Sequence, residues 1–181
     1  LLGEKSGKVV GITFDDGYQN NLVHALPELQ RNGFSSTCYV VSQLIGKTNV
    51  WDKEVGIPQV PLMTSSELKQ WLEGGQEVGA HTREHVHLPK LDPEQAYFEI
   101  AGCKSEIETL LQVPVDHFCY PYGDFGAGQV DQVRQSKYKS ATTTKRGRCY
   151  AGMSVFELPR VSEVRRTTRL GLAIKIMTGN E

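Results

Sequence analysis

Two adjacent carboxylates and a closely spaced histidine pair are the residues of this chain best suited to chemistry. Asp15 and Asp16 follow the apolar run at residues 9–14, and His81 and His85 lie four positions apart. Histidines at that spacing fit one helical turn and can bind one ion. A hydrolytic metal site uses about three protein ligands and keeps one position for water. One carboxylate would complete such a set, and the other could act as general base for the metal-bound water.

The expected donor set of two imidazoles and one carboxylate narrows the choice of metal. It fits Zn²⁺ best, and Co²⁺, Ni²⁺, Mn²⁺ or Fe²⁺ can substitute. Mg²⁺ prefers oxygen ligands, so the paired histidines disfavour a magnesium-dependent phosphoryl-transfer enzyme. His87 lies two residues from His85 and should point away from the same ion. We expect His24 and His117 to be structural.

The segments that must position these residues alternate between strand and helix patterns. Apolar or β-branched runs predict strands at residues 8–14, 36–41, 77–80, 115–120, 140–144 and 156–161. Helical spacing predicts helices at residues 20–32, 65–73, 93–113, 130–136 and 167–177. This alternation predicts a parallel sheet with helices outside, either open or closed into a barrel. One site is expected because four segments fall at or just past strand ends, namely residues 15–16, 81–85, 120–123 and 158–160.

Local signals add detail to these elements. Pro27 should bend or shorten the first helix, and Thr64 with Glu67 forms a capping box for the second. Asp92 should cap the longest helix. We expect its apolar stripe to comprise Tyr97, Ile100, Cys103, Ile107, Leu110 and Leu111. The connection at residues 42–63 is long for a compact domain, and such loops are usually functional or contain short elements.

The turn at residues 120–123 can contribute to substrate binding. Tyr120, Pro121, Tyr122 and Gly123 follow a predicted strand and form a rigid turn. Ordinary turn chemistry explains the same residues. If the turn lies at the site, its aromatic faces suit a sugar ring, and the Tyr122 N–H could stabilise an oxyanion.

Composition bounds the class of protein. A chain of 181 residues with 39% apolar and 23% charged residues is long enough for one domain, residues 1–181, with a full core. Its net charge of -1 argues against a nucleic-acid binder. No apolar stretch reaches the ~20 residues of a transmembrane helix. There is no signal peptide and no initiator Met, so we expect a mature or N-terminally trimmed fragment.

The four cysteines indicate no thiolate zinc site, because no CxxC spacing occurs among them. Cys38 and Cys119 lie in apolar runs and should be small buried hydrophobes. A disulfide between Cys119 and Cys149 is one option, so cysteine usage leaves the compartment open.

Together, these segments resemble the polysaccharide deacetylases of the NodB-homology group, carbohydrate esterase family 4. Residues 13–17, Thr-Phe-Asp-Asp-Gly, are similar to the first motif of that family. Residues 81–85, His-Thr-Arg-Glu-His, followed by Leu88, are similar to its His-[Ser/Thr]-x-x-His motif. Residues 119–123, Cys-Tyr-Pro-Tyr-Gly, look like a variant of its Arg-x-Pro-[Tyr/Phe]-Gly motif. The resemblance covers residues 8–161 and is specific in its first two motifs.

The resemblance implies a fold and a set of roles. The fold would be a distorted, incomplete (β/α) barrel, with parallel strands inside, helices outside and the metal at the C-terminal rim. Asp15 would be the general base, and Asp16, His81 and His85 would hold the metal. The Tyr122 amide would help to bind the tetrahedral oxyanion. The implied reaction is hydrolysis of N-acetyl groups on N-acetylglucosamine residues of a polysaccharide, and the family analogy implies an extracytoplasmic location.

Three departures from the family pattern matter. Cys119 stands where the third motif has Arg, and this variant with Leu-Pro-Arg at residues 158–160 is similar to the poly-N-acetylglucosamine deacetylase branch. We therefore expect Arg160 to replace the lost guanidinium by pairing with Asp15. The late Leu-x-His motif, credited with the general acid, is absent, since no His follows His117. The Asp-Trp pair of the fourth motif is not visible either.

Two further functions remain open. An O-acetyl esterase acting on xylan or a related glycan could use the same metal and base. It would demand less of a general acid, because an alcohol leaves more easily than an amine. A glycan-binding domain with a vestigial metal site is the non-enzyme alternative.

Overall fold

One sheet of six parallel strands runs through the computed structural model, which describes residues 9–164 and 166–179. Each strand pairs with the next one along the chain. The strands are β1 (Ile12–Phe14), β2 (Ser36–Val40), β3 (Glu77–Ala80), β4 (His117–Cys119), β5 (Ser140–Arg146) and β6 (Leu158–Arg160). Within the described ranges no strand pairing joins β1 to β6, so the sheet is an open, incomplete barrel, which confirms the expected fold class.

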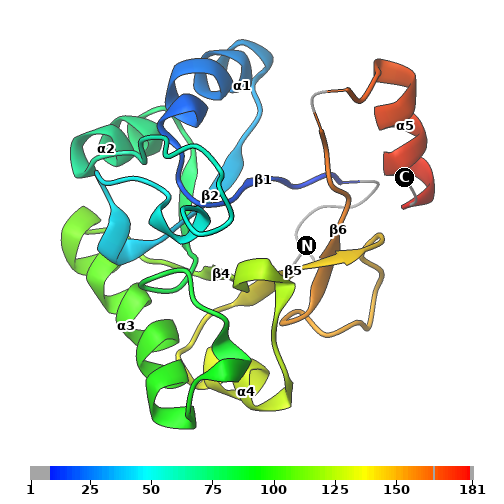
Figure 1. Ribbon diagram of the computed structural model, residues 1–181. Helices are drawn as coiled ribbons and strands as arrows, with labels where there is room; N and C mark the ends of the chain where they lie inside the picture. The colour runs from blue at the N-terminus through cyan, green and yellow to red at the C-terminus, as the bar shows by residue number, and fades with distance from the viewer. Residues whose placement is uncertain (1–8, 165, 180–181) are drawn as a thin grey trace.

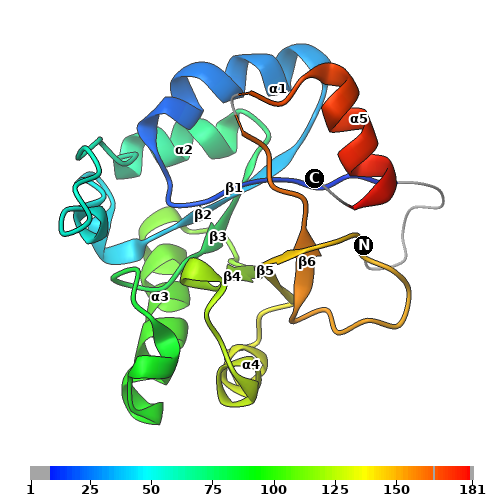
Figure 2. The ribbon, with the colours of Figure 1, turned by 45° about the vertical axis from the view of Figure 1, so that its right-hand side comes forward.

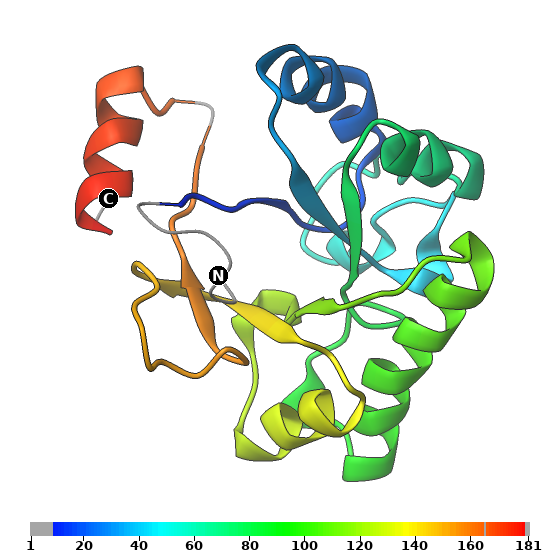
Figure 3. The same ribbon diagram turned by 180° about the vertical axis from the view of Figure 1, so that it is seen from behind.

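Helices cover the outside of this sheet, as Figures 1 and 2 show. They are α1 (Leu26–Asn32), α2 (Ser65–Glu73), α3 (Pro93–Leu111), α4 (Ala127–Gln135) and α5 (Arg169–Thr178). Seen from behind, α5 stands apart from α2 and α3, on the side of β6 (Figure 3). This helix–sheet alternation brings the C-terminal ends of the strands to one rim.

The core between the sheet and helices α2 and α3 is apolar and tightly buried. Trp71 and Phe118 are fully buried in it, together with Leu68, Ile100 and Ile107. The Trp71 indole N–H donates to the Glu77 carbonyl over 3.0 Å, so its polar atom is satisfied. Burying side chains of this size stabilises the fold by roughly 1.5–3 kcal/mol each.

Several local predictions are confirmed. Thr64 and Glu67 form the reciprocal capping box of α2, and the Asp92 side chain accepts from the Gln95 N–H at the start of α3. Pro27 stands in the first turn of α1, and the turn before it, Asn21–Ala25, is a π-helix. Proline lacks an N–H and crowds the preceding turn, so the two helical pieces differ in hydrogen bonding. The long connection contains two 3₁₀ turns, Ser42–Leu44 and Val50–Asp52.

Other predictions need correction. The first strand begins at Ile12; Val9 and Val10 are 49% and 57% exposed, and Lys8 lies outside the described residues. β1 is an edge strand whose pairing with β2 starts only at Ile12↔Ser36, so residues before it have no partner there. On α3, Tyr97 and Leu110 are exposed, because the buried face runs instead through Ala96, Glu99, Ile100, Cys103, Ile107 and Leu111.

The cysteine and α5 expectations also change. Cys119 and Cys149 form no disulfide; both thiols are free, as are those of Cys38 and Cys103. The apolar residues of α5 are half-exposed or exposed, although its sequence is amphipathic. In the part of the chain that the structure describes, no helix has both the length and the apolar character to cross a membrane.

Candidate metal centre

The carboxyl ends of the strands bring most of the predicted site residues to one pocket; Pro121 and Arg160 do not line it. β1 runs directly into Asp15 and Asp16, and β3 into His81. The pocket has a volume of about 250 Å³. Its lining residues are Asp15, Asp16, Trp51, Asp52, His81, His85, Tyr120, Tyr122 and Thr144. Residues from three separate sequence motifs thus line one cavity.

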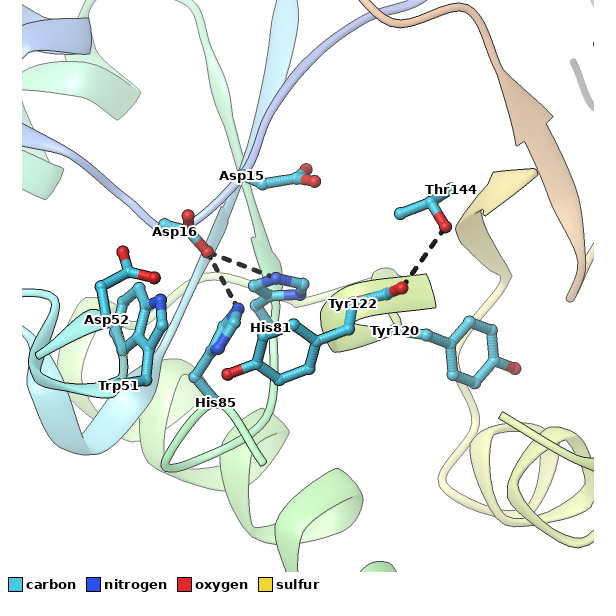
Figure 4. A pocket seen from close by; sticks show the side chains of 9 residues that line it. All are labelled: Asp15, Asp16, Trp51, Asp52, His81, His85, Tyr120, Tyr122 and Thr144. Atoms are coloured by element: carbon cyan, nitrogen blue, oxygen red, sulfur yellow. Dashed lines mark hydrogen bonds and ion pairs between the residues drawn. The ribbon is translucent and has the colours of Figure 1, made fainter. Parts of the chain in front are cut away.

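Three donors within this pocket point at one place. Asp16 Oδ1 lies 3.4 Å from His81 Nε2 and 3.3 Å from His85 Nε2 (Figure 4). The same oxygen is buried and makes no hydrogen bond of good geometry. An unpartnered buried carboxylate oxygen is costly unless a cation compensates it. Two imidazoles and one carboxylate therefore fit a divalent ion of the zinc type.

The two histidines are held in different ways. His81 Nδ1 lies 2.7 Å from the Cys119 carbonyl oxygen, which favours a proton on Nδ1 and leaves Nε2 free as a donor to a metal. His85 Nδ1 has no hydrogen-bond partner among the described residues. Its ring instead stacks on Trp51 at 4.2 Å and meets the edge of Tyr122 at 4.6 Å. Aromatic packing thus orients His85, whereas a hydrogen bond orients His81.

Asp15 lies beside this donor cluster, with one oxygen within 4.8 Å of a His81 ring nitrogen, and pairs with Arg160. Figure 4 shows the two adjacent carboxylates pointing in different directions. Arg160 Nη1 and Nη2 each donate to one oxygen of Asp15 over 2.7 Å, in the bidentate geometry of strong guanidinium–carboxylate pairs. The guanidinium also donates to the Thr143 carbonyl and the Thr13 hydroxyl. The pairing expected from the sequence is confirmed, and it spans the open gap between β6 and β1.

Electrostatics separate the two aspartates. Burial by itself would raise the pKa of Asp15, but the hydrogen bonds and charge of Arg160 hold it below its ordinary value. Burial opposes ionisation of Asp16 as well, yet the nearby His81 and His85 hold its pKa far below the usual range. Both carboxylates are therefore ionised at neutral pH.

The pKa values of the two histidines beside Asp16 shift in opposite directions. Burial would lower the pKa of His81, but its contacts with Cys119 and Asp16 raise it well above the ordinary value. Burial lowers the pKa of His85, and the neighbouring His81 charge lowers it further. A metal would displace the proton from His81, since ligating imidazoles are neutral.

Left-handed backbone conformations concentrate at the pocket. Asp16, Thr82, His85 and Tyr122 have positive φ angles of 71°, 63°, 57° and 59°. The other two such non-glycine residues among those described, Gln112 and Lys137, lie at helix ends. Left-handed non-glycine residues cost roughly 1–3 kcal/mol each and persist where surrounding contacts impose them. The pocket is thus a strained region of the backbone.

The residues of the turn after β4 differ in how exposed their side chains are. Tyr120 is fully buried; its hydroxyl donates to the Phe156 carbonyl over 3.1 Å, and its ring points away from the donor cluster (Figure 4). Pro121 is also buried. Tyr122 is 45% exposed, and its ring stacks on His87 at 4.0 Å. Of the three predicted substrate contacts, only Tyr122 offers an exposed side chain, while the other two shape the wall.

Gly123 is required by this turn, and its replacement is expected to destabilise the fold. Its φ is +69°, and an added Cβ would lie 1.8 Å from Thr144 Oγ1. We expect Gly123→Ala to lower the free energy of unfolding by about 1–3 kcal/mol, as measured by urea denaturation. Gly128→Ala in α4 is the matched control, because its Cβ would meet nothing within 4 Å. Equal stability of the two variants would contradict the steric argument.

Sequence patterns had not indicated Trp51, Asp52 and Thr144 as pocket residues. The first two lie in the long connection, where loop length was the only signal. Fully buried Asn49 organises that loop: its amide donates to Asp52 over 2.8 Å, and its oxygen accepts from the Val60 N–H over 2.7 Å. These hydrogen bonds fix the loop in which Trp51 stacks on the His85 ring.

The remaining histidines lie outside the donor cluster, as expected. His87 contacts Asp124 over 2.9 Å and stacks on Tyr122. His117 contacts Ser140 over 2.8 Å at the other end of the sheet. His24 lies exposed in the π-helical turn. The sequence-based separation of ligand histidines from structural ones agrees with these positions.

Comparisons with known proteins agree with this architecture. Residues 2–141 match the family model described as polysaccharide deacetylase. YxkH of Bacillus subtilis, which carries a provisional polysaccharide deacetylase name, is 26% identical over 156 residues, which are 86% of this chain and 52% of that protein. The chain thus spans about half the length of this curated relative. Arg160 lies beyond the residues that the family model matches.

Two solved structures share the fold. Deacetylase PplD of Streptococcus pyogenes, in complex with acetate, has a TM-score of 0.82 at 22% identity, over 94% of this chain and 71% of that chain. A de-N-acetylase from Aggregatibacter actinomycetemcomitans has a TM-score of 0.75 at 14% identity, over 95% of this chain and 76% of that chain. At these identities the two likenesses establish a common fold.

Proposed function

The chain belongs to the polysaccharide deacetylase family, and we propose that it is a metal-dependent hydrolase that removes N-acetyl groups from N-acetylglucosamine residues of a polysaccharide. One observation carries the proposal. The His81 and His85 rings lie within 3.4 Å of a buried Asp16 oxygen that has no hydrogen-bond partner. A second carboxylate, that of Asp15, lies beside them and pairs with Arg160. The acetate bound to PplD supports an acetyl substrate, and the de-N-acetylase of Aggregatibacter actinomycetemcomitans supports an amide.

In this proposal the three convergent donors hold a divalent ion, most suitably Zn²⁺, with Co²⁺, Ni²⁺, Mn²⁺ or Fe²⁺ as substitutes. When bound, such an ion lowers the pKa of water and polarises the acetyl carbonyl. The Cys119 carbonyl keeps Nε2 of His81 directed at the ion's position. Trp51 and Tyr122 restrict His85 and exclude solvent from its ring faces.

Further pocket residues accept the proton of the attacking water and stabilise the oxyanion. Asp15, kept ionised by Arg160, accepts the proton of the attacking water. The other pocket carboxylate outside the donor set, Asp52, accepts from the Asn49 amide in the long loop. The Tyr122 backbone N–H supplies a hydrogen bond to the developing oxyanion. The exposed Tyr122 ring lies beside the sugar, with Tyr120 and Pro121 behind it as the wall.

An O-acetyl ester substrate is the second candidate, and one observation favours it. The sequence holds no His beyond His117, and so no counterpart of the family's late acid histidine. An alcohol leaves with less need for protonation than an amine, so residues 1–181 by themselves suit an ester better.

Acetate release separates these functions. The chain, reconstituted with Zn²⁺, is assayed on chitooligosaccharides and on acetylated xylan. Faster release from chitooligosaccharides supports N-deacetylation, and the reverse order supports the esterase. Binding of either glycan without acetate release, together with no effect of Asp15→Asn, would indicate a glycan-binding domain. We also propose that the protein, like its polysaccharide substrate, is located outside the cytoplasm.

Removal of a predicted ligand should greatly weaken metal binding. We expect His81→Ala to weaken Zn²⁺ binding by more than the roughly 10- to 100-fold typical of lost outer-shell partners, and to abolish acetate release. Equilibrium dialysis with metal analysis measures the change. His24→Ala removes an exposed imidazole and should alter neither quantity. Chelator treatment should inactivate the wild type, and added Zn²⁺ should restore it; an active metal-free protein would refute metal dependence.

A further inference from the structure

The short turn between His81 and His85 needs outside support. It places two left-handed residues, Thr82 and His85, within four positions. One bond inside the turn helps, from the His85 N–H to Thr82 Oγ1 over 3.0 Å. The turn carbonyls accept from the loop after β2, through the Ser42 and Gln43 N–H groups. Its two middle N–H groups, those of Arg83 and Glu84, still require an acceptor.

Glu99 of α3 supplies that acceptor. Its Oε2 accepts from the Arg83 N–H over 2.8 Å and from the Glu84 N–H over 3.0 Å. Glu99 is only 7% exposed and lies on the buried face of α3, among apolar side chains. Burying a carboxylate there is costly unless it is hydrogen-bonded, so these two bonds account for its presence in the helix core.

We propose that Glu99 is a positioning residue for the metal centre: it holds the left-handed turn that sets the distance between His81 and His85. The proposal rests on the metal-dependent function proposed above. Glu99 is directed at the turn's backbone, not at the pocket, whose lining it does not join. Its effect on the ligands passes through the backbone, since the two N–H groups it binds lie between the two histidines.

A second carboxylate on the same helix binds the turn differently. Glu106 accepts from the Arg83 side chain over 2.8 Å and from Ser42 Oγ over 2.5 Å. The Arg83 guanidinium also lies over the Phe98 ring, at 4.1 Å. These contacts fix a side chain on the outside of the turn. Among the described side chains, only Glu99 accepts from the Arg83 and Glu84 N–H groups.

Metal affinity of Glu99 variants tests the proposal. Zn²⁺ binding is measured by competition with a chromophoric chelator, and Co²⁺ spectra report ligand geometry. We expect Glu99→Ala to raise the Zn²⁺ dissociation constant by roughly 10- to 100-fold, the range for residues that orient metal ligands. Glu99→Gln should recover most of the affinity, because one amide oxygen can accept both N–H groups. Glu99→Asp should not, since its shorter side chain cannot reach the turn.

Glu108→Ala is the matched control. Glu108 is also a carboxylate of α3 that accepts a backbone N–H, that of Val115 over 3.0 Å, but Val115 lies outside the histidine turn. Its loss should affect stability without changing Zn²⁺ affinity. If Glu99→Ala does not fold, the comparison of the Gln and Asp variants decides the question.

The outcomes distinguish the two proposals. Wild-type protein that binds no Zn²⁺ would overturn the proposed function. Wild-type protein that binds Zn²⁺ through His81 and His85, with affinity unchanged in the Ala and Asp variants, would overturn the role of Glu99 alone. Weaker binding in both, restored by Gln and unaffected in Glu108→Ala, would support it.

Discussion

Asp15→Asn is expected to lower the rate of acetate release by about 10²- to 10⁴-fold, the range for loss of a general base. The amide keeps the shape of the side chain but cannot accept a proton. Metal binding should persist, because Asp15 pairs with Arg160 and does not belong to the three convergent donors. Steady-state kinetics and metal analysis of the same sample check both expectations.

Asp16→Asn provides the contrast for this prediction. It should lose metal and activity together, since Asp16 carries the oxygen shared by both histidines. The two neighbouring substitutions are nearly identical in chemistry and differ only in which partner each carboxylate faces. An Asp15→Asn protein that lost metal as Asp16→Asn did, or kept full activity, would contradict the division of roles.

Arg160→Ala should reduce kcat/KM by about 10²-fold, because a misplaced base loses its alignment with the reacting water. The side chains of Asp15 and Arg160 are 32% and 19% exposed, so solvent reduces the loss of stability below that of a fully buried pair, to about 1–3 kcal/mol. Thermal or urea unfolding measures this second quantity.

The pH profile gives this prediction a sharper test. Arg160 holds the pKa of Asp15 below its ordinary value, so removing the guanidinium should raise that pKa. The acidic limb of kcat/KM then moves to higher pH.

The stability that the pair contributes is present above the pKa of the unfolded carboxyl and is lost as pH falls through the depressed folded pKa. Arg160→Ala should therefore flatten the acid dependence of unfolding.

Arg160→Lys is the informative intermediate. It keeps a positive charge near Asp15 but cannot form the two parallel bonds of the guanidinium. We expect a smaller shift of the acidic limb than in the Ala variant, with catalysis still impaired. Normal activity and an unchanged acidic limb in Arg160→Ala would remove Arg160 from the site's mechanism.

The position of Arg160 also explains the variant third motif. Cys119 stands where the family motif has Arg, and Arg160 Nη2 approaches its sulfur to 3.3 Å. In this chain the guanidinium that pairs with Asp15 thus comes from β6. A small side chain at Cys119 is compatible with this approach, whereas two arginines would compete for Asp15.

Sequence patterns were sufficient where the interactions are local. The strand-to-glycine turn at Asp15 and Asp16, the capping box of α2 and the spacing of His81 and His85 each depend on a few neighbouring residues. Alternating strand and helix periods also predicted the parallel sheet, because each crossover helix must pack back on the sheet. The placement of these motifs at strand ends then predicted one site.

Periodicity was less reliable where exposure depends on the tertiary environment. Tyr97 and Leu110 are apolar and near the stripe of α3, yet they face solvent, while the charged Glu99 is buried. Glu99 is buried because it accepts hydrogen bonds from the Arg83 and Glu84 N–H groups of the histidine turn, which no pattern within α3 indicates. Tyr120 and Tyr122 likewise differ in burial, although they lie two residues apart in one aromatic turn.

By itself, the sequence indicated that two imidazoles and one of two adjacent carboxylates could meet one ion, since residue type and short spacing restrict which side chains can do so; the family resemblance then predicted which carboxylate is the ligand and which the base. Only the tertiary structure decided how they are held. The Arg160–Asp15 pair, which only the family resemblance led us to expect, joins residues 145 positions apart across the open edge of the barrel. Trp51 reaches His85 from a long loop, and Glu99 reaches the histidine turn from α3. These contacts depend on strand order and register, which arise from long-range packing and leave no local pattern.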